Sequence, residues 1–254
     1  MINIKDPKDC CGCTACASIC AHNAITMKTD ALGFLYPEVD TTKCVNCGMC
    51  DKVCAFNGNY DLSLNFPEPK AYGVRHKDMM EVETSRSGAA FIAISDWILA
   101  HGGVVYGAGY TDHFRVVHKR ATNKEERDEF KGSKYVQSDL SNIYRQIKCY
   151  LAEGRYVMFS GTPCQVAGLK LFLRKPYSNL LMVDLICHSV PSPLIFKDYV
   201  NFVEKKNNKK LESIKMRDKE KGWSHRFYYR YLFRDGTSIG SDTLNCEHWG
   251  RFYF

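Results

Sequence analysis

The pattern of apolar and polar positions divides the chain near residue 70. Before that point the apolar residues come in short runs, and residues 24–27 and 34–36, on either side of a glycine, predict two short strands. Residues 57–69 are polar and contain one glycine and two prolines, which is typical of a linker. We therefore predict two domains, at 1–60 and 70–254.

Strands and helices follow one another in the second part of the chain. The spacing of apolar residues predicts helices at 89–100, 140–152, 163–173 and 193–206, and strands at 71–75, 104–110, 114–119, 155–160, 179–187, 211–217, 225–233 and 237–240. The charged stretch 123–132 is expected to be a loop. A strand, a helix and a second strand within 155–187 imply neighbouring parallel strands. This part should be an α/β domain with a mixed, partly parallel sheet.

The turn that enters the third predicted helix carries the clearest local signal. Thr162 is a good N-cap, Pro163 suits the first helical position, and Gln165 completes a capping box. Ligands of open α/β sheets collect beyond the carboxyl ends of the strands. This turn and the end of the next strand, at Cys187 and His188, are therefore candidate site segments.

Cys164 lies in the first turn of the same helix, where the helix dipole and free N–H groups favour a thiolate. Cys164 and Cys187 could be half of a metal-cluster site, a redox pair, or buried small residues, and their spacing does not decide between these. His188 could act as an acid–base group or be a polar strand end. We take Cys164 and His188 as the candidate catalytic residues.

Cysteine content changes this picture, because eight of the thirteen cysteines form a repeat near the amino end. The pattern C-x-x-C-x-x-C-x-x-x-C occurs twice, and it matches the run that binds two [4Fe–4S] clusters in bacterial ferredoxins. In that arrangement the fourth cysteine of each run binds the other cluster. The predicted ligands are Cys10, Cys13, Cys16 and Cys54 for one cluster, and Cys44, Cys47, Cys50 and Cys20 for the second. The predicted fold class is thus α+β, with a ferredoxin-like 2[4Fe–4S] domain before the α/β domain.

Other interpretations of these cysteines are weaker. Zinc sites use two separated C-x-x-C pairs or mixed Cys/His ligands, and a disulfide framework needs an oxidising compartment. Alanines at 21 and 55 replace the proline that commonly follows the fourth cysteine, but proline donates no ligand. Cys11 is out of step with the repeat, and we expect it to be a free thiol beside the cluster.

Charge and hydropathy limit the classes of partner and the cellular compartment that we predict for this protein. The net charge is +7, and the basic cluster Lys205, Lys206, Lys209 and Lys210 ends a predicted helix, which favours a solvated helix end over a nucleic-acid site. The net charge also allows weak attraction to acidic redox proteins. We find neither a membrane-span pattern nor a signal-peptide pattern, and we predict a cytoplasmic protein.

Two further stretches have the chemistry of an anion site. Ser85, Ser87 and Gly88 stand at a predicted helix start, where hydroxyl and backbone N–H groups can hold a phosphate, although serine also caps many helices. Lys134 and Tyr135 could meet an anionic or aromatic cofactor, or belong to an ordinary loop.

A family resemblance gives these stretches a role. The segments KGSKYVQSDL, FSGTPCQVAGLK, LICHSVPSP and MRDKEKGW resemble the beta-subunit family of coenzyme F420-reducing hydrogenase and dehydrogenase over nearly the whole chain. The resemblance implies an FAD-containing iron–sulfur protein. It also implies that the flavin is bound by the residues Ser85, Ser87, Gly88, Lys134, Tyr135, Gly161, Thr162, Pro163 and Gln165.

The resemblance further implies a third [4Fe–4S] cluster with Cys164 and Cys187 as two of its ligands. Family members continue into another C-x-x-C that this chain lacks, and Cys246 fits that position poorly. We therefore expect either two clusters or a sequence that is truncated at its C-terminus. Ser189 also replaces the glycine of the family's C-H-G motif, which restricts the backbone there.

The functional prediction is an oxidoreductase that moves electrons between ferredoxin-type clusters, FAD and a soluble two-electron acceptor such as coenzyme F420. Its expected partners are ferredoxin or another redox protein and the small-molecule acceptor, with no nucleic acid and no membrane span. The alternative is a non-enzymatic electron-relay subunit of a larger redox complex.

Overall fold

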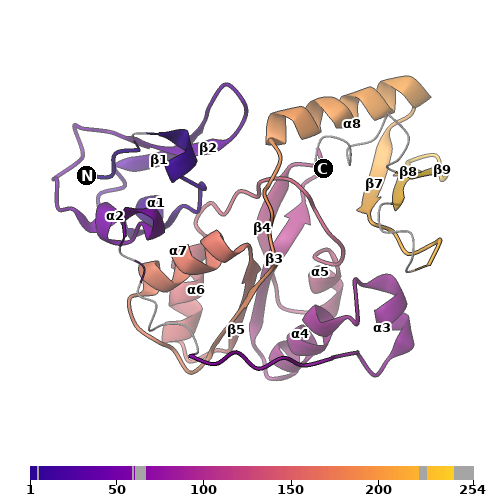
Figure 1. The fold of residues 1–254 in the computed structure, drawn as a ribbon, viewed down its shortest axis with the longest axis horizontal. Coiled ribbons are helices and arrows are strands. Elements are labelled where there is room, and N and C mark those ends of the chain that lie inside the picture. Colours follow the sequence, from indigo (N-terminus) through magenta and orange to yellow (C-terminus); the bar gives the residue numbers. More distant parts are fainter. Residues whose placement is uncertain (5, 59, 61–66, 223–227, 243–254) are drawn as a thin grey trace.

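The computed structural model describes residues 1–4, 6–58, 60, 67–222 and 228–242 (Figure 1). Its amino-terminal part contains the 3₁₀ helix η1 (Pro7–Asp9), helix α1 (Ala15–Ile19), strands β1 (Ile25–Thr29) and β2 (Leu35–Val39), helix α2 (Met49–Lys52) and the 3₁₀ helix η2 (Ala55–Asn57). The two strands form an antiparallel hairpin in which Ile25 lies opposite Val39. Both strands were predicted, and each begins one residue later and extends further than the sequence pattern indicated.

The central part is built around a four-stranded mixed sheet. In chain order it contains α3 (Met79–Thr84), α4 (Ala90–Ala100), β3 (Val104–Tyr110), β4 (Val116–Ala121), α5 (Lys124–Asp128), α6 (Ile143–Ala152), β5 (Val157–Gly161), α7 (Pro163–Leu173) and β6 (Leu180–Asp184). The strand order is β4-β3-β5-β6, and β3–β5 and β5–β6 are parallel whereas β3–β4 is antiparallel. The predicted α+β fold with a mixed, partly parallel sheet is confirmed.

Alternate residues of the central strands face different helices, as the two-residue period of a strand requires. Tyr106 and Phe159 are fully buried against α6 and α7. Val105 and Met158, one position away in each strand, are fully buried in a second cluster with Ile98 of α4. The sheet therefore lies between two helical layers, and its α6–α7 side faces the amino-terminal part (Figure 1).

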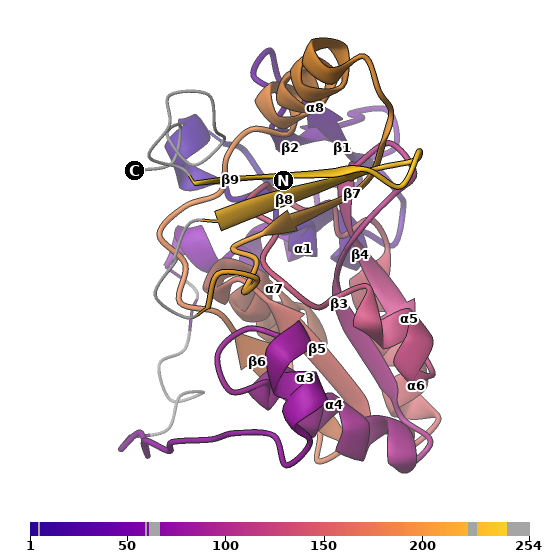
Figure 2. The same cartoon turned by 90° about the vertical axis from the view of Figure 1, so that its right-hand side faces the viewer.

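The carboxyl-terminal part is a second sheet covered by one helix. It consists of α8 (Pro193–Asn207), β7 (Leu211–Met216), β8 (Tyr228–Phe233) and β9 (Ser238–Asp242), with antiparallel pairing in the order β7-β8-β9. Figure 2 shows α8 above this sheet, and Phe196 and Val203 of α8 share a buried core with Tyr231. The hydroxyl groups of Tyr199 and Tyr231 lie 2.6 Å apart in this core. Within the described residues no helix has the length and apolar content of a membrane span.

The predictions of a strand at 71–75 and of a loop at 123–132, which contains helix α5, were wrong. Residues 71–75, all of them described, form no strand; Tyr72 and Val74 are exposed there, so the apolar alternation has no layer to pack on. Two short helices were missed, and both depend on capping side chains. Asp78 accepts a hydrogen bond from the Met80 N–H at the start of α3, and Asn123 accepts one from the Glu126 N–H at the start of α5.

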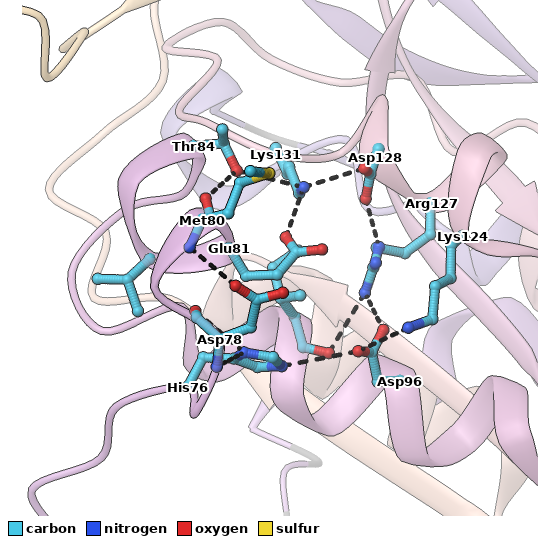
Figure 3. Close-up of polar contacts among 12 residues, drawn as sticks. His76, Asp78, Met80, Glu81, Thr84, Asp96, Lys124, Arg127, Asp128 and Lys131 are labelled. Carbon is cyan, nitrogen blue, oxygen red and sulfur yellow. Dashed lines mark hydrogen bonds and ion pairs between the residues drawn. The ribbon is translucent and has the colours of Figure 1, made fainter.

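A network of ion pairs fixes α3 against α4 and α5 (Figure 3). The fully buried Arg127 side chain binds Asp96 Oδ1 at 2.8 Å and Asp128 Oδ1 at 2.8 Å. Lys131 Nζ lies 2.6 Å from Glu81 Oε2 in α3 and 2.9 Å from Asp128 Oδ2. Breaking one partner of a buried pair leaves an uncompensated charge, so this network holds α3, and the loop that follows it, in place.

Candidate functional site

Four cysteines from both runs line one pocket in the amino-terminal part. Cys20 follows α1, whereas Cys44, Cys47 and Cys50 belong to the loop and helix α2, and together they border one small, almost wholly apolar pocket. The backbone N–H groups of Ile2 and Ala24 donate to Cys50 Sγ (3.0 Å) and Cys20 Sγ (3.3 Å). Such N–H donors to sulfur are a recognised way of tuning an iron–sulfur cluster. The residues brought together are those predicted for the second cluster.

The other four cysteines gather on the side of this domain that faces α7. Burial raises the pKa of Cys10 to about 11, and the neighbouring Cys13 and Cys54 thiols add to this effect. Burial also raises the pKa of Cys16 and of Cys54, each with a contribution from Cys13. Three of the four thiols therefore resist ionisation when bare, whereas the pKa of Cys13 is lowered. Such thiols become thiolates when a metal supplies positive charge, so this donor set is compatible with a metal cluster.

The sulfurs are more widely spread than the ligands of a single ion. In the part of the chain that the structure describes, no three Cys, His, Asp or Glu side chains converge as single-ion ligands. Each cysteine of a [4Fe–4S] cubane binds a different iron atom, so this spread is compatible with a cubane. The assignment of the eight individual ligands stays a prediction.

Helix α7 packs directly on the first run of cysteines. A Cβ atom at Gly168 would lie 2.9 Å from Cys13 Sγ and 3.1 Å from the Tyr144 hydroxyl, so only glycine leaves room for this approach. Gly12 has φ +67°, and a Cβ there would lie 2.7 Å from the Leu35 carbonyl oxygen. The loop that carries the first cluster's predicted ligands thus fits closely between α7 and β2.

Cys164 lies at this contact, in the first turn of α7, as predicted. The neighbouring Cys11 thiol, together with Thr162 Oγ1 at 3.1 Å from Cys164 Sγ, lowers the pKa of Cys164 to about 6 against the opposing effect of burial. Cys11 therefore has the largest effect on the pKa of Cys164. From the sequence, where it is one residue out of step with the repeat, we expected only a free thiol beside the cluster.

Cys187 and His188 follow β6 and are exposed. Burial of part of the Cys187 thiol and the nearby charge of Cys164 both raise the pKa of Cys187. The two cysteines are thus within electrostatic reach of one another. The catalytic roles of Cys164 and His188 and the third cluster stay predictions, and Cys246 lies outside the described residues.

Arg145 of α6 anchors the amino-terminal part, and the sequence pattern did not single it out. Its guanidinium donates to the carbonyl oxygens of Ser18 (2.7 Å), Ala17 (3.2 Å) and Cys20 (2.8 Å). These carbonyls belong to the carboxyl end of α1, where a cation is favoured by the free carbonyl groups. Through this hydrogen bond to the Cys20 carbonyl, Arg145 connects a predicted cluster ligand directly to α6, one of the helices that cover the central sheet.

The loop 85–88 lies against the end of β7, where cations gather. Arg86 Nη2 donates to the Met216 carbonyl (3.0 Å), and Lys219 Nζ donates to the Ser87 carbonyl (3.1 Å). Arg217 lies close enough to Arg86 to lower its pKa, after the larger effect of burial. Among the described residues, the buried hydroxyl of Ser85 has no hydrogen-bond partner. This arrangement of N–H, hydroxyl and cationic groups fits an anionic phosphate.

The predicted residues Lys134 and Tyr135 join the same region. Tyr135 N–H donates to Met216 Sδ (3.3 Å), and Arg217 Nη1 donates to the Tyr135 hydroxyl (3.1 Å). Lys134 Nζ lies 5.5 Å from the ring centre of Tyr110, and burial lowers the pKa of Lys134 to about 8. The cations Arg86, Arg217 and Lys219 were not predicted as site residues, although Arg217 and Lys219 stand in a segment that carried the family resemblance.

A buried polar chain supports the turn that carries Gly161, Thr162, Pro163 and Gln165. Gln165 Oε1 accepts from the Thr162 N–H at 3.0 Å, which is part of the predicted capping box. Gln165 Nε2 donates to Ser138 Oγ (2.9 Å), and Ser138 Oγ lies 3.0 Å from His118 Nδ1. The His118 Nε2 then contacts the Ser160 carbonyl oxygen at 3.0 Å. Burial lowers the pKa of His118 to about 4, so the ring is neutral in this chain.

One segment, residues 134–138, connects the separate parts of the site. Tyr135 contacts the cationic end of β7, and Ser138 contacts Gln165 in the turn before α7. Between them, Gln137 donates through Nε2 to the Cys11 carbonyl (3.3 Å) and accepts the Leu35 N–H through Oε1 (3.0 Å). Segment 134–138 therefore contacts all three parts of the site: the candidate phosphate-binding region, the turn before α7 and the first cysteine run.

Comparison with known families agrees with this arrangement of parts. Residues 9–57 match the model of the 4Fe-4S dicluster domain, and residues 154–242 match that of the coenzyme F420 hydrogenase/dehydrogenase beta subunit, C terminus. The chain is thus similar to a 4Fe-4S dicluster domain at its amino end and to the C terminus of the coenzyme F420 hydrogenase/dehydrogenase beta subunit further along. The resemblance expected from the sequence and the iron–sulfur character of the amino-terminal domain are thereby confirmed.

One solved structure similar to this chain is the F420-reducing [NiFe] hydrogenase complex from Methanosarcina barkeri, in a xenon derivative. The alignment has 18% sequence identity and a TM-score of 0.44, and it covers 67% of this chain and 59% of that chain. The match thus spans less than two thirds of the hydrogenase subunit's length. A search of the curated proteins finds no match.

Proposed function

We propose that this protein is an iron–sulfur flavoprotein oxidoreductase. It would move electrons between ferredoxin-type [4Fe–4S] clusters, FAD and a soluble two-electron acceptor such as coenzyme F420. The observation that carries the proposal is the segment 134–138, whose side chains and backbone contact both the cationic loop region and the first cysteine run. A flavin bound at the cationic region would share this support with the cluster that hands it electrons.

The loop 85–88 and the end of β7 would bind the diphosphate of FAD. Ser85, Ser87 and Gly88 offer hydroxyl and N–H groups, and Arg86 and Lys219 offer charge-assisted donors. The unpartnered, buried Ser85 hydroxyl is a group that such a ligand would satisfy.

The flavin ring would lie toward Lys134, Tyr135 and the turn 161–165. FAD supplies the exchange between one-electron and two-electron transfer, while the protein positions the ring and excludes water. Lys134, with its pKa lowered to about 8, can hold or release a proton near neutral pH. Thr162, Gln165 and the His118–Ser138 chain keep the turn rigid beneath it.

The two cysteine sites suggest an order of electron transfer. The second site has the exposed Cys47 and Val45 at its border, whereas the first lies against α7. Electrons from ferredoxin or another redox protein would enter at the second site and reach the flavin region through the first. A third cluster at Cys164 and Cys187 is not required for this order.

A relay subunit of a larger redox complex is the second candidate. Leu181, Leu185 and Ile186 are exposed along and after β6, and Ile186 is 99% exposed. Large exposed apolar groups close together are typical of a protein–protein contact. A relay would use the same clusters but would pass electrons to a partner subunit.

Cofactor analysis and a reduction assay test the proposal. Anaerobically purified protein should contain about eight iron atoms per chain, as two cubanes require, and should release FAD on denaturation. Reduced ferredoxin should bleach the bound flavin, and a small acceptor should then restore its colour without a second protein. Protein with eight irons but no flavin would contradict the enzyme and favour the relay, and protein that binds zinc instead would contradict both.

A further inference from the structure

A hollow in the surface lies where the dicluster domain meets α6 and α7. The end of α1 and the turn after it form one wall, and Lys148 and Cys149 of α6 with Phe172 of α7 form the other. Cys20, a predicted ligand of the second cluster, borders this hollow and also the apolar pocket of the second cysteine site. The hollow and the pocket therefore adjoin at one cysteine.

Two cations on the same face of α6 give the hollow a positive charge. Arg145 donates to the Cys20 carbonyl (2.8 Å) and to Asn23 Oδ1 (2.9 Å). Lys148, three residues further along the helix, places its Nζ 5.7 Å from the ring centre of Phe172. Within the described part of the chain neither cation has a carboxylate partner, and none of the residues that line the hollow is acidic. Such a hollow attracts an anionic group.

The turn after α1 separates the hollow from the apolar pocket, since Ala21 and Asn23 line the hollow and His22 lines the pocket. All three side chains are exposed. Val45, which also borders the pocket, is 58% exposed. An apolar centre beside a charged rim is typical of a protein–protein contact, and a contact of about 800 Å² per partner is wide enough to cover the turn, the hollow and the pocket together.

We infer that an acidic redox protein docks over this turn, with one of its carboxylates seated between Arg145 and Lys148. Docking there brings the donor group of the partner next to Cys20, so that the reduced partner loses one electron and the second cluster gains it. The partner's carboxylate neutralises two charges that no described side chain of this protein neutralises. A small free anion would pair with the same cations, but it would gain nothing from the exposed turn or from Val45.

The docking surface extends the proposed function, because it is where electrons would enter. Its role rests on the proposed function only through the cluster of the second site, and it does not depend on FAD. Protein that holds clusters but no FAD would therefore contradict the proposed function and leave the docking surface intact.

Crosslinking identifies the lysine that the partner touches. The full-length, iron-loaded protein is mixed at low salt with an acidic 2[4Fe–4S] ferredoxin and a carbodiimide, which joins a lysine amine to a carboxylate in direct contact. Mass spectrometry of the digest should find Lys148 joined to a ferredoxin carboxylate. The exposed Lys197 belongs to α8, a helix that lies away from α6 (Figure 1), and it should not be joined.

Charge variants at the same position give a kinetic test. Lys148→Met keeps an apolar stem over Phe172 and removes the charge, whereas Lys148→Glu reverses the charge. At low salt, stopped-flow reduction of the clusters by dithionite-reduced ferredoxin should slow about threefold in Lys148→Met and about tenfold in Lys148→Glu, and high salt should shrink both differences. Lys197→Glu is the matched control and should keep the wild-type rate.

Three results would overturn the docking surface. Crosslinks that avoid Lys148 would place the partner elsewhere, and equal slowing by Lys148→Glu and Lys197→Glu would report net charge alone. Wild-type rates in both Lys148 variants would leave the hollow to a small anion. Iron content should be the same in the wild type and all three variants, so that a slower rate reports docking. Loss of iron from Lys148→Met would make the lysine structural and would overturn the docking surface as well.

Discussion

The two cysteine sites of the dicluster domain arise from one sequence repeat but occupy different surroundings. The first lies against α7, where Gly168 leaves room for Cys13. The second opens to the surface beside Val45 and the exposed Cys47. Equal ligand spacing thus gives an inner site, whose protein environment is shared with the second domain, and an outer site that a partner can approach.

The inner and outer sites should differ most in what happens when one predicted cysteine ligand is removed. Cys13→Ser and Cys47→Ser should each lose about four of about eight irons. Cys13→Ser should also loosen the contact with α7 and lower the melting temperature of the whole chain, whereas Cys47→Ser should change the melting temperature little. Iron quantitation and thermal unfolding measure both effects, and equal melting temperatures would contradict the distinction between an inner and an outer site.

Acid should lower the stability of the fold through His118, whose hydrogen-bond chain supports the turn before α7. The pKa of His118 is lowered by burial to about 4, below its ordinary 6.5. As the pH falls from 6.5 to 4, the unfolded chain takes up a proton there and the folded chain does not, so the folded state loses stability. The loss should be on the order of 3 kcal/mol across this window.

His118→Asn should remove that part of the pH dependence, although it also lowers stability at neutral pH. His113→Asn, at an exposed position after β3, is the matched control and should leave the pH dependence intact. Urea unfolding at pH 4.5, 5.5 and 7 gives the comparison. Parallel curves for the wild type and His118→Asn would contradict the assignment.

The attachment of the dicluster domain should depend on Arg145. Arg145→Ala removes three donor contacts to the end of α1 and should cost about 2 kcal/mol. We expect faster proteolysis of the dicluster domain at unchanged iron content. Lys148→Ala, on the exposed side of the same helix, is the control, and an equal effect of both variants would show that the contacts of Arg145 do not hold the domain.

The smallest effect is expected at the border of the outer site. Val45, which is 58% exposed, should lie under an acidic redox partner. Val45→Glu should slow reduction by ferredoxin a few-fold at low salt, and salt should reduce the difference. Leu32→Glu, in the β1–β2 hairpin and away from the pocket, should leave the rate unchanged. Stopped-flow kinetics at two ionic strengths decides whether the outer site is the point of entry.

Helix-capping residues and the spacing of apolar residues predicted much of this fold. The helix at α7 was found to the residue from Thr162 and Pro163, because its cap and its apolar face agree. The strand expected at 71–75 was wrong because alternation alone does not say whether a layer covers it. Helices α3 and α5 were missed because their apolar residues show only weak helical periodicity. A cap such as Asp78 stabilises so short a helix only when ion pairs such as Lys131–Glu81 also hold the helix in place, and these form only in the folded chain.

The site was predictable where ligand chemistry fixes spacing and unpredictable where contacts join distant segments. The cysteine repeat identified the dicluster domain. No pattern connects Arg145 to the carbonyls of α1, Gln137 to Cys11, or His118 to Ser160, since these pairs meet only after folding. The domain boundary at 60–70 and the cytoplasmic location stay predictions.

Gly168 has a consequence for the speed of the proposed electron transfer. The rate of electron tunnelling falls exponentially with the gap between donor and acceptor. By lacking a side chain, Gly168 lets Cys13 rest directly on the backbone of α7, which is the helix that begins at the candidate cofactor turn. In the proposed electron path from the first cluster to this turn, the absence of a Cβ at Gly168 would shorten the gap, and the side chain of Gly168→Ala would widen it and slow the transfer.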